Sequence, residues 1–274
     1  MIPAAFDYVR VDSADAAIAQ LVEHGDDAKI LAGGHSLIPL MKLRLASPAK
    51  LVDVGRVKEL SYIKDAGDHI AIGALTRHRD VEISTVLKEH NPLLAHAASY
   101  VGDPQVRHRG TIGGSVAHGD GASDLPAVVL ALGGTMVAKG PKGERTIAAA
   151  DFFHGFLTTA LAEDELLMEI RVPKITGAGW SFQKFNRRAQ DWAIVGVAAW
   201  KQNGSSGIGL VNMGSTPVRA SASEAALNGG ASAADAAALA ADGLEPPADL
   251  NASVEYRQHL ARVLVRRALV ECGA

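Results

Sequence analysis

The stretch that decides the fold runs from Lys29 to Arg44 and reads KILAGGHSLIPLMKLR. Its first residues, Lys29–Ala32, form the kind of short, mostly apolar run that makes a buried strand. Gly33 and Gly34 follow, and the apolar run Leu37–Leu45 then has the composition of a helix. Because glycine has no Cβ, such a turn presents bare backbone N–H groups, and successive bare N–H groups bind phosphate. The stretch on its own fits a tight turn without a ligand equally well.

A second paired-glycine stretch, RGTIGGS, spans Arg109–Ser115 and has a hydroxyl residue, Thr111, at its entrance. Two such turns in one chain are suited to grip the two phosphates of a dinucleotide from both sides. Neither stretch has the G-x-G-x-x-G spacing of the nicotinamide-binding fold, so that fold has no support here. The pair of stretches therefore favours a dinucleotide site of another type.

Composition and charge narrow the class of protein. The chain has 274 residues, of which 48% are hydrophobic and 21% charged, enough for two modest domains or one large one. A net charge of −3 gives no sign of a general nucleic-acid or anionic-membrane surface. No apolar run approaches the ~20 residues that a membrane helix needs. Asp7 and Arg10 stand where a signal peptide would be apolar, so we expect a cytoplasmic protein.

Cysteine and histidine usage limits the metal chemistry. Cys272 is the only cysteine, which excludes an internal disulfide and an iron–sulphur cluster held by this chain alone. His118, Asp120 and Asp124 can be drawn as metal ligands, but the chain has no H-x-H or H-E-x-x-H pair, and a solvated glycine-rich loop explains them better. We also find no catalytic triad. We therefore expect neither a resident metal nor a catalytic side chain.

The patterning predicts an α+β fold. Residues 1–176 form two α/β lobes, about 1–57 and 58–176, and the glycine-rich segment Ile175–Gly179 marks a linker. Residues 177–274 form a small antiparallel sheet of three strands with helices. Two of its strands are joined by a hairpin at Asn203-Gly204, a strong turn signal.

Two local predictions concern helix faces and a basic segment. Ala14–Glu23 is expected to be a helix with Ile18, Leu21 and Val22 on one face. Val101–Arg109 is expected to be a basic loop. Its basic residues Arg107, His108 and Arg109 either meet a phosphate or lie in solvent, and we favour solvent for at least two of the three.

Three segments together resemble the FAD-binding medium subunit of molybdenum hydroxylases, the flavoprotein chain of carbon monoxide dehydrogenase and xanthine dehydrogenase-like enzymes. They are AGGHSLIPLMKLR at Ala32–Arg44, RGTIGGS at Arg109–Ser115 and ASDLP at Ala122–Pro126. A fourth segment, FQKFNRRAQDWAIVGVAA at Phe182–Ala199, resembles the second domain of that family. The segments follow the family's order and cover nearly the whole chain. The resemblance implies an FAD-binding region of the vanillyl-alcohol-oxidase-like type.

The resemblance also implies which residues contact FAD. The backbone of the two glycine stretches holds the diphosphate from two sides, and Asp124 contacts the flavin cofactor. The flavin ring is expected to point towards the C-terminal domain. The full set expected at FAD is Ile30, Leu31, Ala32, Gly33, Gly34, His35, Ser36, Leu37, Val101, Thr111, Ile112, Gly113, Gly114, Ser115, Asp124, Leu167, Lys184 and Trp192. Apart from the resemblance, Val101 and Leu167 are equally explained as core, Lys184 as a solvated strand residue and Trp192 as packing between domains.

The implied function is electron transfer. In the family, [2Fe-2S] clusters and a molybdenum pterin cofactor lie on partner chains, a small iron–sulphur subunit and a large molybdenum subunit. The resemblance thus implies a dimer of heterotrimers in which this chain holds only FAD, because the flavin itself supplies the redox chemistry.

Two other functions stay open from the residues. His35 in AGGHS resembles the histidine that carries covalent FAD in vanillyl-alcohol-oxidase-like flavoproteins, which favours a stand-alone oxidase. Those chains are much longer and carry a large substrate domain. The third possibility is a non-enzymatic dinucleotide-binding or assembly protein, which a yellow colour on purification and a flavin reduced by partner proteins would exclude.

Overall fold

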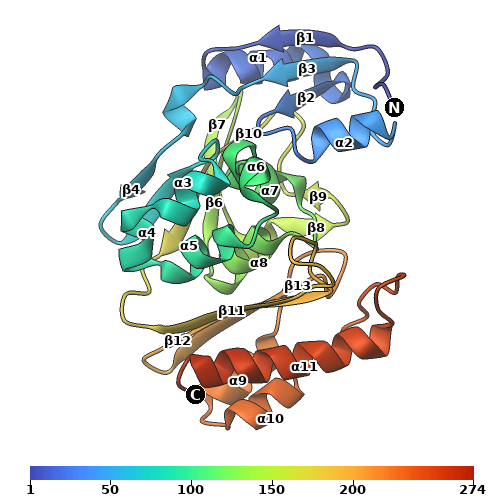
Figure 1. Cartoon of the computed structure of the whole chain (residues 1–274). Coiled ribbons are helices and arrows are strands. Elements are labelled where there is room, and N and C mark those ends of the chain that lie inside the picture. The colour runs from blue at the N-terminus through green and yellow to red at the C-terminus, as the bar shows by residue number, and fades with distance from the viewer.

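The computed structural model describes all residues, 1–274, and its three larger β-sheets lie one above another (Figure 1). The N-terminal lobe lies at the top of the view, the second lobe in the middle and the C-terminal domain at the bottom. The two chain termini lie at opposite ends of this stack. The mixed arrangement confirms the predicted α+β class.

The N-terminal lobe is built on a three-stranded parallel sheet in the order β1-β3-β2. Its elements are β1 (Asp7–Arg10), α1 (Ala14–His24), a short 3₁₀ turn (Gly25–Asp27), β2 (Ala28–Leu31), α2 (Leu37–Lys42) and β3 (Lys50–Asp53). Parallel strands need a crossover, and α1 supplies it between β1 and β2. The carboxyl ends of parallel strands share one edge of the sheet. The first glycine turn leaves β2 at that edge.

Helix α1 shows how the sequence pattern sets a buried face. The Ser13 hydroxyl accepts the N–H of Ala16 at 3.2 Å and begins the helix. Its buried residues, Ala14, Ala17, Ile18 and Leu21, follow the i, i+3, i+4, i+7 spacing. The prediction that Val22 belongs to this face is wrong, because one residue beyond Leu21 the helix has turned by about 100° and Val22 is 55% exposed.

The second lobe carries a five-stranded antiparallel sheet in the order β4-β5-β10-β6-β7. A 3₁₀ turn (Lys58–Leu60) precedes β4. The sheet strands are β4 (Ile63–Asp65), β5 (His69–Gly73), β6 (Thr135–Gly140), β7 (Gly143–Ala148) and β10 (Leu166–Pro173). Six helices lie between β5 and β6: α3 (His78–Ile83), α4 (Thr85–His90), α5 (Pro92–Ser99), α6 (Pro104–Arg109), α7 (Ile112–His118) and α8 (Asp124–Ala131). A 3₁₀ turn (Ala149–Asp151) and the small hairpin β8 (Phe153–Gly155) and β9 (Thr158–Thr159) precede β10.

The basic segment after Val101 is a helix, which corrects the predicted loop. Asp103 accepts the N–H of Val106 at 2.8 Å, and Pro104 occupies the first turn of α6. Arg107 is half-buried and paired with a glutamate, whereas His108 and Arg109 are exposed. Two of the three are thus exposed, as favoured, and Arg109 also lines a cavity that is described below. The Asp-Pro pair was the helix signal that the prediction overlooked.

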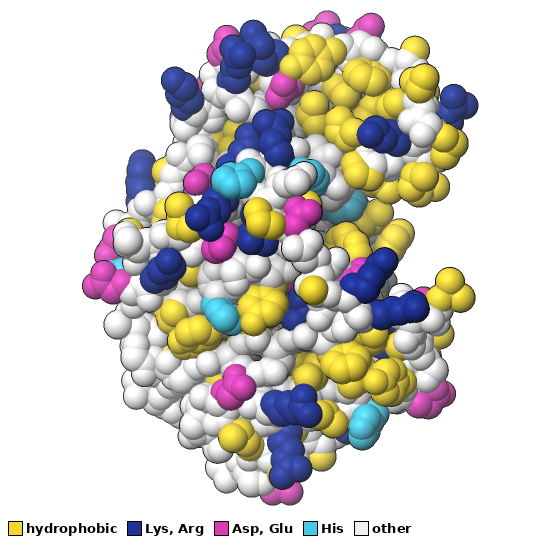
Figure 2. Space-filling model, viewed as in Figure 1, with side chains coloured by type: hydrophobic (Ala, Val, Ile, Leu, Met, Phe, Trp, Pro, Cys, Tyr) yellow, Lys and Arg dark blue, Asp and Glu magenta, His cyan; other side chains and the backbone are white.

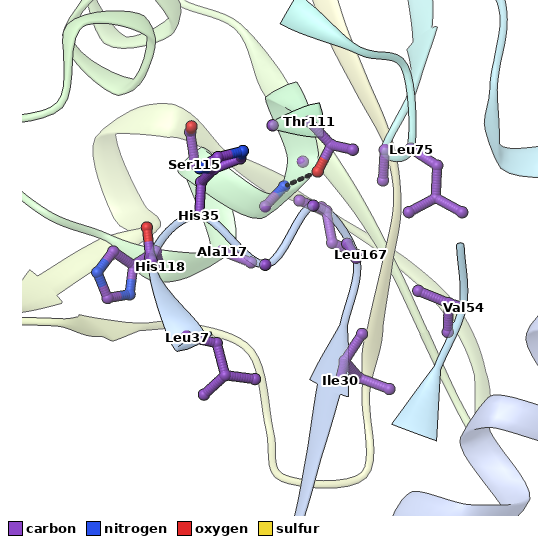
Figure 3. Close-up of a pocket in the computed structure, with 18 of the residues that line it drawn as sticks. Ile30, His35, Leu37, Val54, Leu75, Thr111, Ser115, Ala117, His118 and Leu167 are labelled. Atoms are coloured by element: carbon purple, nitrogen blue, oxygen red, sulfur yellow. Dashed lines mark hydrogen bonds between the residues drawn. The ribbon is translucent and has the colours of Figure 1, made fainter. Parts of the chain in front are cut away.

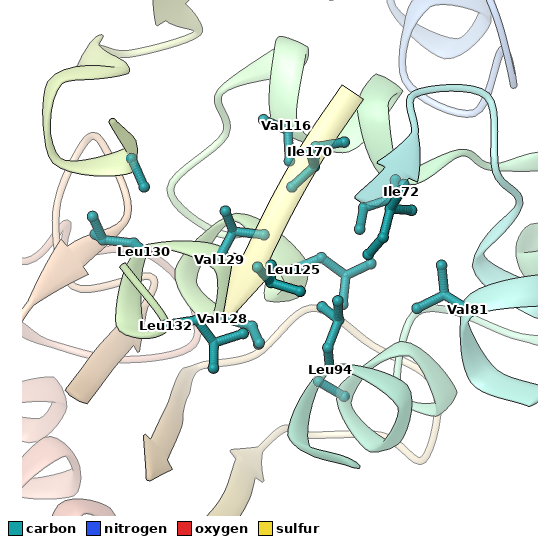
Figure 4. Close-up of a cluster of buried hydrophobic side chains, with 14 of the residues drawn as sticks. Ile72, Val81, Leu94, Val116, Leu125, Val128, Val129, Leu130, Leu132 and Ile170 are labelled. Carbon is teal, nitrogen blue, oxygen red and sulfur yellow. The ribbon is translucent and has the colours of Figure 1, made fainter. Parts of the chain in front are cut away.

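Helix α8 lies at the centre of the molecule and is buried along its whole length. Figure 4 shows its side chains Leu125, Val128 and Val129 gathered with Ile170 of β10 and residues of the surrounding helices. The same apolar cluster of 29 residues also reaches Phe182 and Ala198 of the C-terminal sheet. The second lobe and the C-terminal domain therefore share one core.

The C-terminal sheet has four strands rather than three. It runs in the order β11-β12-β13-β14, and its elements are β11 (Gly179–Phe185), β12 (Val195–Gln202), β13 (Ser205–Val211) and β14 (Val218–Arg219). The fourth strand is only two residues long, too short for an alternation pattern to reveal. The hairpin at Asn203-Gly204 is confirmed, with φ of 50° and 77° at its two central residues.

The C-terminal sheet is covered on both faces. Helices α9 (Ser221–Asn228), α10 (Ala233–Ala238) and α11 (Val254–Glu271) form a second core on one side. On the other side β13 lies directly on α8, because Gly207 and Gly209 let the strand approach the carbonyl oxygens of Ala131 and Ala127 so closely that a Cβ would overlap them. No helix in the chain is long and apolar enough to span a membrane.

Candidate functional site

A cleft between the N-terminal lobe and the second lobe holds a cavity of about 310 Å³. Both glycine stretches line it, together with apolar side chains from the two lobes (Figure 3). Its size is within the range of small-molecule sites, and its lining of apolar groups with a few polar ones is typical of them. Two stretches that are far apart in the sequence therefore meet at one cavity, as the sequence predicts.

The first glycine turn is the main source of hydrogen-bond donors. The backbone N–H groups of Gly33, Gly34, His35 and Ser36 donate to no atom of the chain. Gly34 has a φ of +80°, a conformation that glycine adopts without strain. Four successive free N–H groups around such a turn are suited to bind an anion. This confirms the prediction of bare N–H groups in the first turn.

Gly33 is required by the chain itself. A Cβ at this position would lie 2.6 Å from the carbonyl oxygen of Arg109 and 2.8 Å from the Cα of Gly110. The turn of the N-terminal lobe therefore rests directly on the backbone that leads into the second glycine stretch. Gly110 also has no room for a side chain, since a Cβ there would lie 2.6 Å from the ring of His78 in the second lobe.

The second glycine stretch differs from its prediction as a turn with bare N–H groups. It forms the first turns of α7, where the Thr111 hydroxyl accepts the Gly114 N–H at 3.1 Å. The N–H groups of Ile112, Gly113 and Ser115 donate to carbonyl oxygens of the chain. Gly113 lies so close to the backbone of Ala74 that it has no room for a Cβ. This stretch therefore offers the cavity hydroxyl groups and a close-fitting wall rather than a second row of donors.

Ser115 and His78 form a polar pair at the cavity wall. Ser115 Oγ lies 3.3 Å from His78 Nε2, and the buried Nδ1 of His78 has no hydrogen-bond partner. Burial lowers the pKa of His78 to about 4, with further lowering from His35 and Arg107, so the ring is neutral at pH 7. We assign the ring proton to Nε2, because a buried N–H left at Nδ1 would have no acceptor. Ser115 then accepts from His78, and its own hydroxyl proton is free to point into the cavity.

Asp124 and Lys184 form a second polar group, which the structure places outside the lining of this cavity. Lys184 Nζ donates to Asp124 Oδ2 at 2.7 Å and to the carbonyl oxygen of Tyr100 at 3.0 Å. Both side chains are buried, and Asp124 Oδ1 has no partner. Burial raises the pKa of Asp124 to about 6, although the charge of Lys184 and its hydrogen bond lower it. The interpretation of Lys184 as a solvated strand residue is wrong.

The remaining predicted residues fall into three environments. Leu167 is buried and lines the cavity, whereas Ile112 is buried without reaching it, and Val101 packs against the core of the second lobe. Leu31 lines a second cavity, which also borders the first glycine turn. Trp192 is 58% exposed and lines neither cavity. The predicted residues that line the cavity are Ile30, Ala32, Gly33, Gly34, His35, Ser36, Leu37, Thr111, Gly113, Gly114, Ser115 and Leu167.

Several lining residues were not predicted. Val54, Leu75, Ala117 and His118 reach the cavity from three different segments and are drawn in Figure 3. The apolar ones have no sequence signal that separates a cavity wall from an ordinary core. His118 does not belong to any group that could hold a metal ion. Asp120 accepts the N–H of Ala122 at 2.9 Å instead, which is the loop role that the sequence favours.

Comparison with known proteins covers the whole chain. The family model described as "FAD binding domain in molybdopterin dehydrogenase" matches residues 4–175, and the model "CO dehydrogenase flavoprotein C-terminal domain" matches residues 180–272. The carbon monoxide dehydrogenase medium chain of Hydrogenophaga pseudoflava is 42% identical, over 98% of this chain and 97% of its own. The 6-hydroxypseudooxynicotine dehydrogenase complex subunit alpha of Paenarthrobacter nicotinovorans is 39% identical, over 99% and 95%.

A solved structure gives the same result. A chain of carbon monoxide dehydrogenase from Hydrogenophaga pseudoflava, in a form that lacks the Mo-pyranopterin moiety of the molybdenum cofactor, superposes with a TM-score of 0.95 and 43% identity. The match covers 100% of this chain and 99% of the other. With both family models matched in order, and relatives matched from end to end, the chain belongs to the family of FAD-binding medium subunits of molybdenum hydroxylases, as its sequence predicts.

Proposed function

We propose that this chain holds FAD in the cleft between its two N-terminal lobes and passes electrons from partner iron–sulphur clusters through the flavin to an external acceptor. The observation that carries the proposal is the first glycine turn. The four residues that carry its free N–H groups line the cleft and belong to a matched FAD-binding domain. An FAD diphosphate carries two negative charges, and backbone donors meet them without a cluster of lysines.

The residues present fit FAD in two further respects. The cavity continues from the glycine turn along apolar side chains of both lobes, among them Ile30, Leu75 and Leu167, which offer van der Waals contact to a planar ring. The orphaned Oδ1 of buried Asp124 is an acceptor that lacks a donor within the chain. A hydroxyl or ring N–H of the cofactor would satisfy it. We therefore keep Asp124, Lys184, Val101 and Trp192 as proposed contacts at the flavin end.

Bound flavin supplies the redox chemistry, because it exchanges electrons with both one-electron and two-electron partners. The chain's own residues bind and orient it. The first turn holds the diphosphate, Ser115 donates its hydroxyl from the wall, and the apolar lining excludes water. No side chain of the chain is assigned an acid–base step.

The partners follow from the family. We propose a unit of this chain with a small iron–sulphur subunit, which carries [2Fe-2S] clusters, and a large molybdenum subunit, which carries the pterin cofactor, paired as a dimer of heterotrimers. The substrate reacts at the molybdenum subunit, and relatives of similar identity carry names as different as carbon monoxide and 6-hydroxypseudooxynicotine dehydrogenase. The proposed location is the cytoplasm, where thiols such as the free, buried one of Cys272 stay reduced.

Co-purification tests this function. A tagged copy of the chain, expressed in its own cells, is expected to bring down two partner chains together with iron and molybdenum. In that complex, substrate is expected to bleach the flavin absorbance. The purified chain alone is expected to give no turnover with carbon monoxide, purines or aromatic heterocycles and an artificial dye. Rapid turnover by the chain alone would reinstate the stand-alone oxidase, and a complex without flavin would reinstate the assembly protein.

A further inference from the structure

A second cavity, of about 480 Å³, also borders the first glycine turn and shares Gly33, Gly34 and His35 with the first cavity. Its wall includes four basic side chains, Lys42, Arg56, Arg77 and Arg109. Figure 2 shows lysine and arginine side chains gathered near histidines where the N-terminal lobe meets the second lobe. The dinucleotide site described above uses none of these four cations.

The four basic side chains share one carboxylate, Asp53, in the cavity wall. None of them forms an ion pair, although their neighbours do: Arg107 and Arg79 pair with Glu82 at 2.9 Å and 3.1 Å. The chain as a whole carries a net charge of −3, so this positive cavity is not the product of a generally basic surface.

The one carboxylate in the cavity wall is already engaged. Asp53 accepts the N–H of Gly55 at 2.8 Å and the hydroxyl of Tyr8. Arg77 is half-buried, and its guanidinium donates to the carbonyl oxygen of Arg109. Burial and then the charge of Arg109 lower the pKa of Arg77, whereas the charges of Asp80 and Asp53 raise it. A bound anion would relieve the repulsion between Arg77 and Arg109.

The four cations reach the cavity from both lobes. Lys42 ends α2 and Arg56 follows β3 in the N-terminal lobe, whereas Arg77 precedes α3 and Arg109 ends α6 in the second lobe. A phosphate group carries up to two charges and three acceptor oxygens, so it satisfies several cationic donors at once, where a single carboxylate has two oxygens. The volume leaves room for the small molecule that carries the phosphate.

We propose that this basic cavity binds the phosphate group of a small molecule, at a site separate from the FAD diphosphate, and that the bound phosphate joins the two lobes beside the first glycine turn. The proposal is independent of electron transfer through the flavin. It adds a ligand to the chain beyond the cofactor of its family.

The test uses the assembled complex and measures binding of radiolabelled inorganic phosphate and of pyrophosphate by equilibrium dialysis at fixed ionic strength. The test variant is Lys42→Gln with Arg56→Gln, because both side chains are exposed and neither donates a hydrogen bond within the chain. The matched control is Arg266→Gln with Arg267→Gln, an equal change of charge on the exposed face of α11. Flavin content and partner chains are measured on the same samples.

Saturable binding of one phosphate per chain is expected in the wild type and the control. The test variant is expected to bind at least about tenfold more weakly, the loss for one charge-assisted contact, with unchanged flavin content. Absence of saturable binding in the wild type, or an equal loss in the control, would overturn the proposal. Loss of flavin in the test variant would assign the cavity to the FAD diphosphate, and loss of a partner chain would assign it to a partner's acidic residue. Both outcomes contradict a separate phosphate site. The flavin content of the wild type tests only the proposed FAD function and does not depend on the phosphate site.

Discussion

Gly33 packs directly against the backbone carbonyl oxygen of Arg109, and this contact joins the two glycine stretches. The glycine is therefore needed for a close approach of backbone to backbone between two lobes. A side chain at Gly33 would push the lobes apart at the point where the first turn faces the cavity. Ligand binding and lobe contact thus depend on the same turn.

This relationship predicts the effect of a single methyl group. Gly33→Ala is expected to lower FAD retention by the complex at least tenfold, because a Cβ 2.6 Å from the Arg109 oxygen forces the turn away from its position. Flavin per folded chain is measured by absorbance after purification. The control is Gly155→Ala, where the new Cβ meets nothing closer than 4.0 Å. Equal flavin content in the two variants would contradict the site.

The pair of Ser115 and His78 predicts a non-additive effect on FAD affinity. Ser115→Ala and His78→Leu are each expected to weaken FAD binding about two- to tenfold, the range for one hydrogen bond, and the double variant no further. His78→Gln keeps a donor near Nε2 and is expected to restore most of the affinity. FAD affinity is measured by titration of the deflavinated complex, and additive losses would show that the two residues act separately.

Buried Asp124 predicts a pH dependence of stability. Burial raises its pKa in the folded chain to about 6, above the ordinary value of 3.8 for an aspartate, so the fold favours the protonated carboxyl. The contribution of Asp124 to the free energy of unfolding is therefore fully present below pH 4. It is lost as the pH rises towards 6, which lowers the free energy of unfolding by about 3 kcal/mol.

Asp124→Asn removes this titration, so its urea midpoint is expected to fall less than that of the wild type between pH 4 and pH 6. The exposed Asp151→Asn is the control. Carboxyls with lowered pKa, such as Glu165, act with the opposite sign, but they are common to both proteins and cancel in the difference. Parallel curves for wild type and Asp124→Asn would refute the prediction.

His35 predicts how the flavin is attached. We expect non-covalent FAD despite the AGGHS sequence, because a relative that matches this chain over 97% of its own length has no room for a large substrate domain. Acid precipitation of the yellow protein is expected to leave all flavin in the supernatant, and His35→Ala is expected to retain FAD. Colour in the acid pellet that is absent from the variant would favour the covalent oxidase.

Much of the fold could be predicted where a local interaction decides the structure. The helix expected at Ala14–Glu23 begins at the Ser13 cap and the expected hairpin turns at Asn203-Gly204, both through short-range geometry. The fourth C-terminal strand could not be predicted, since its two residues exist as a strand only because β13 is beside them. The domain boundaries at 57 and 176 stay a prediction.

The candidate site divides in the same way. The first glycine turn could be predicted because its geometry is determined locally, by the two glycines and the strand before them. The second stretch has the same composition, yet its N–H groups are used by Thr111 and by carbonyls of other segments, which only the tertiary structure reveals. The sequence also has no sign that Lys184 is buried against Asp124, because Lys184 lies on β11 and Asp124 begins α8, and the two meet only in the folded chain. Contact of these residues with FAD stays a prediction.

The close contact of Gly207 and Gly209 of β13 with α8 limits where this chain can be cut into separate fragments. A cut in the segment 175–179, the obvious place for a gene fusion or a protease site, would strip the cover from Ala127 and Ala131 and leave the strand's inner face bare. Two halves made in this way would have to be produced together to be recovered in soluble form. In chimaeras made between relatives, α8 and the C-terminal sheet should therefore come from the same parent. The N-terminal lobe is the part that can be exchanged.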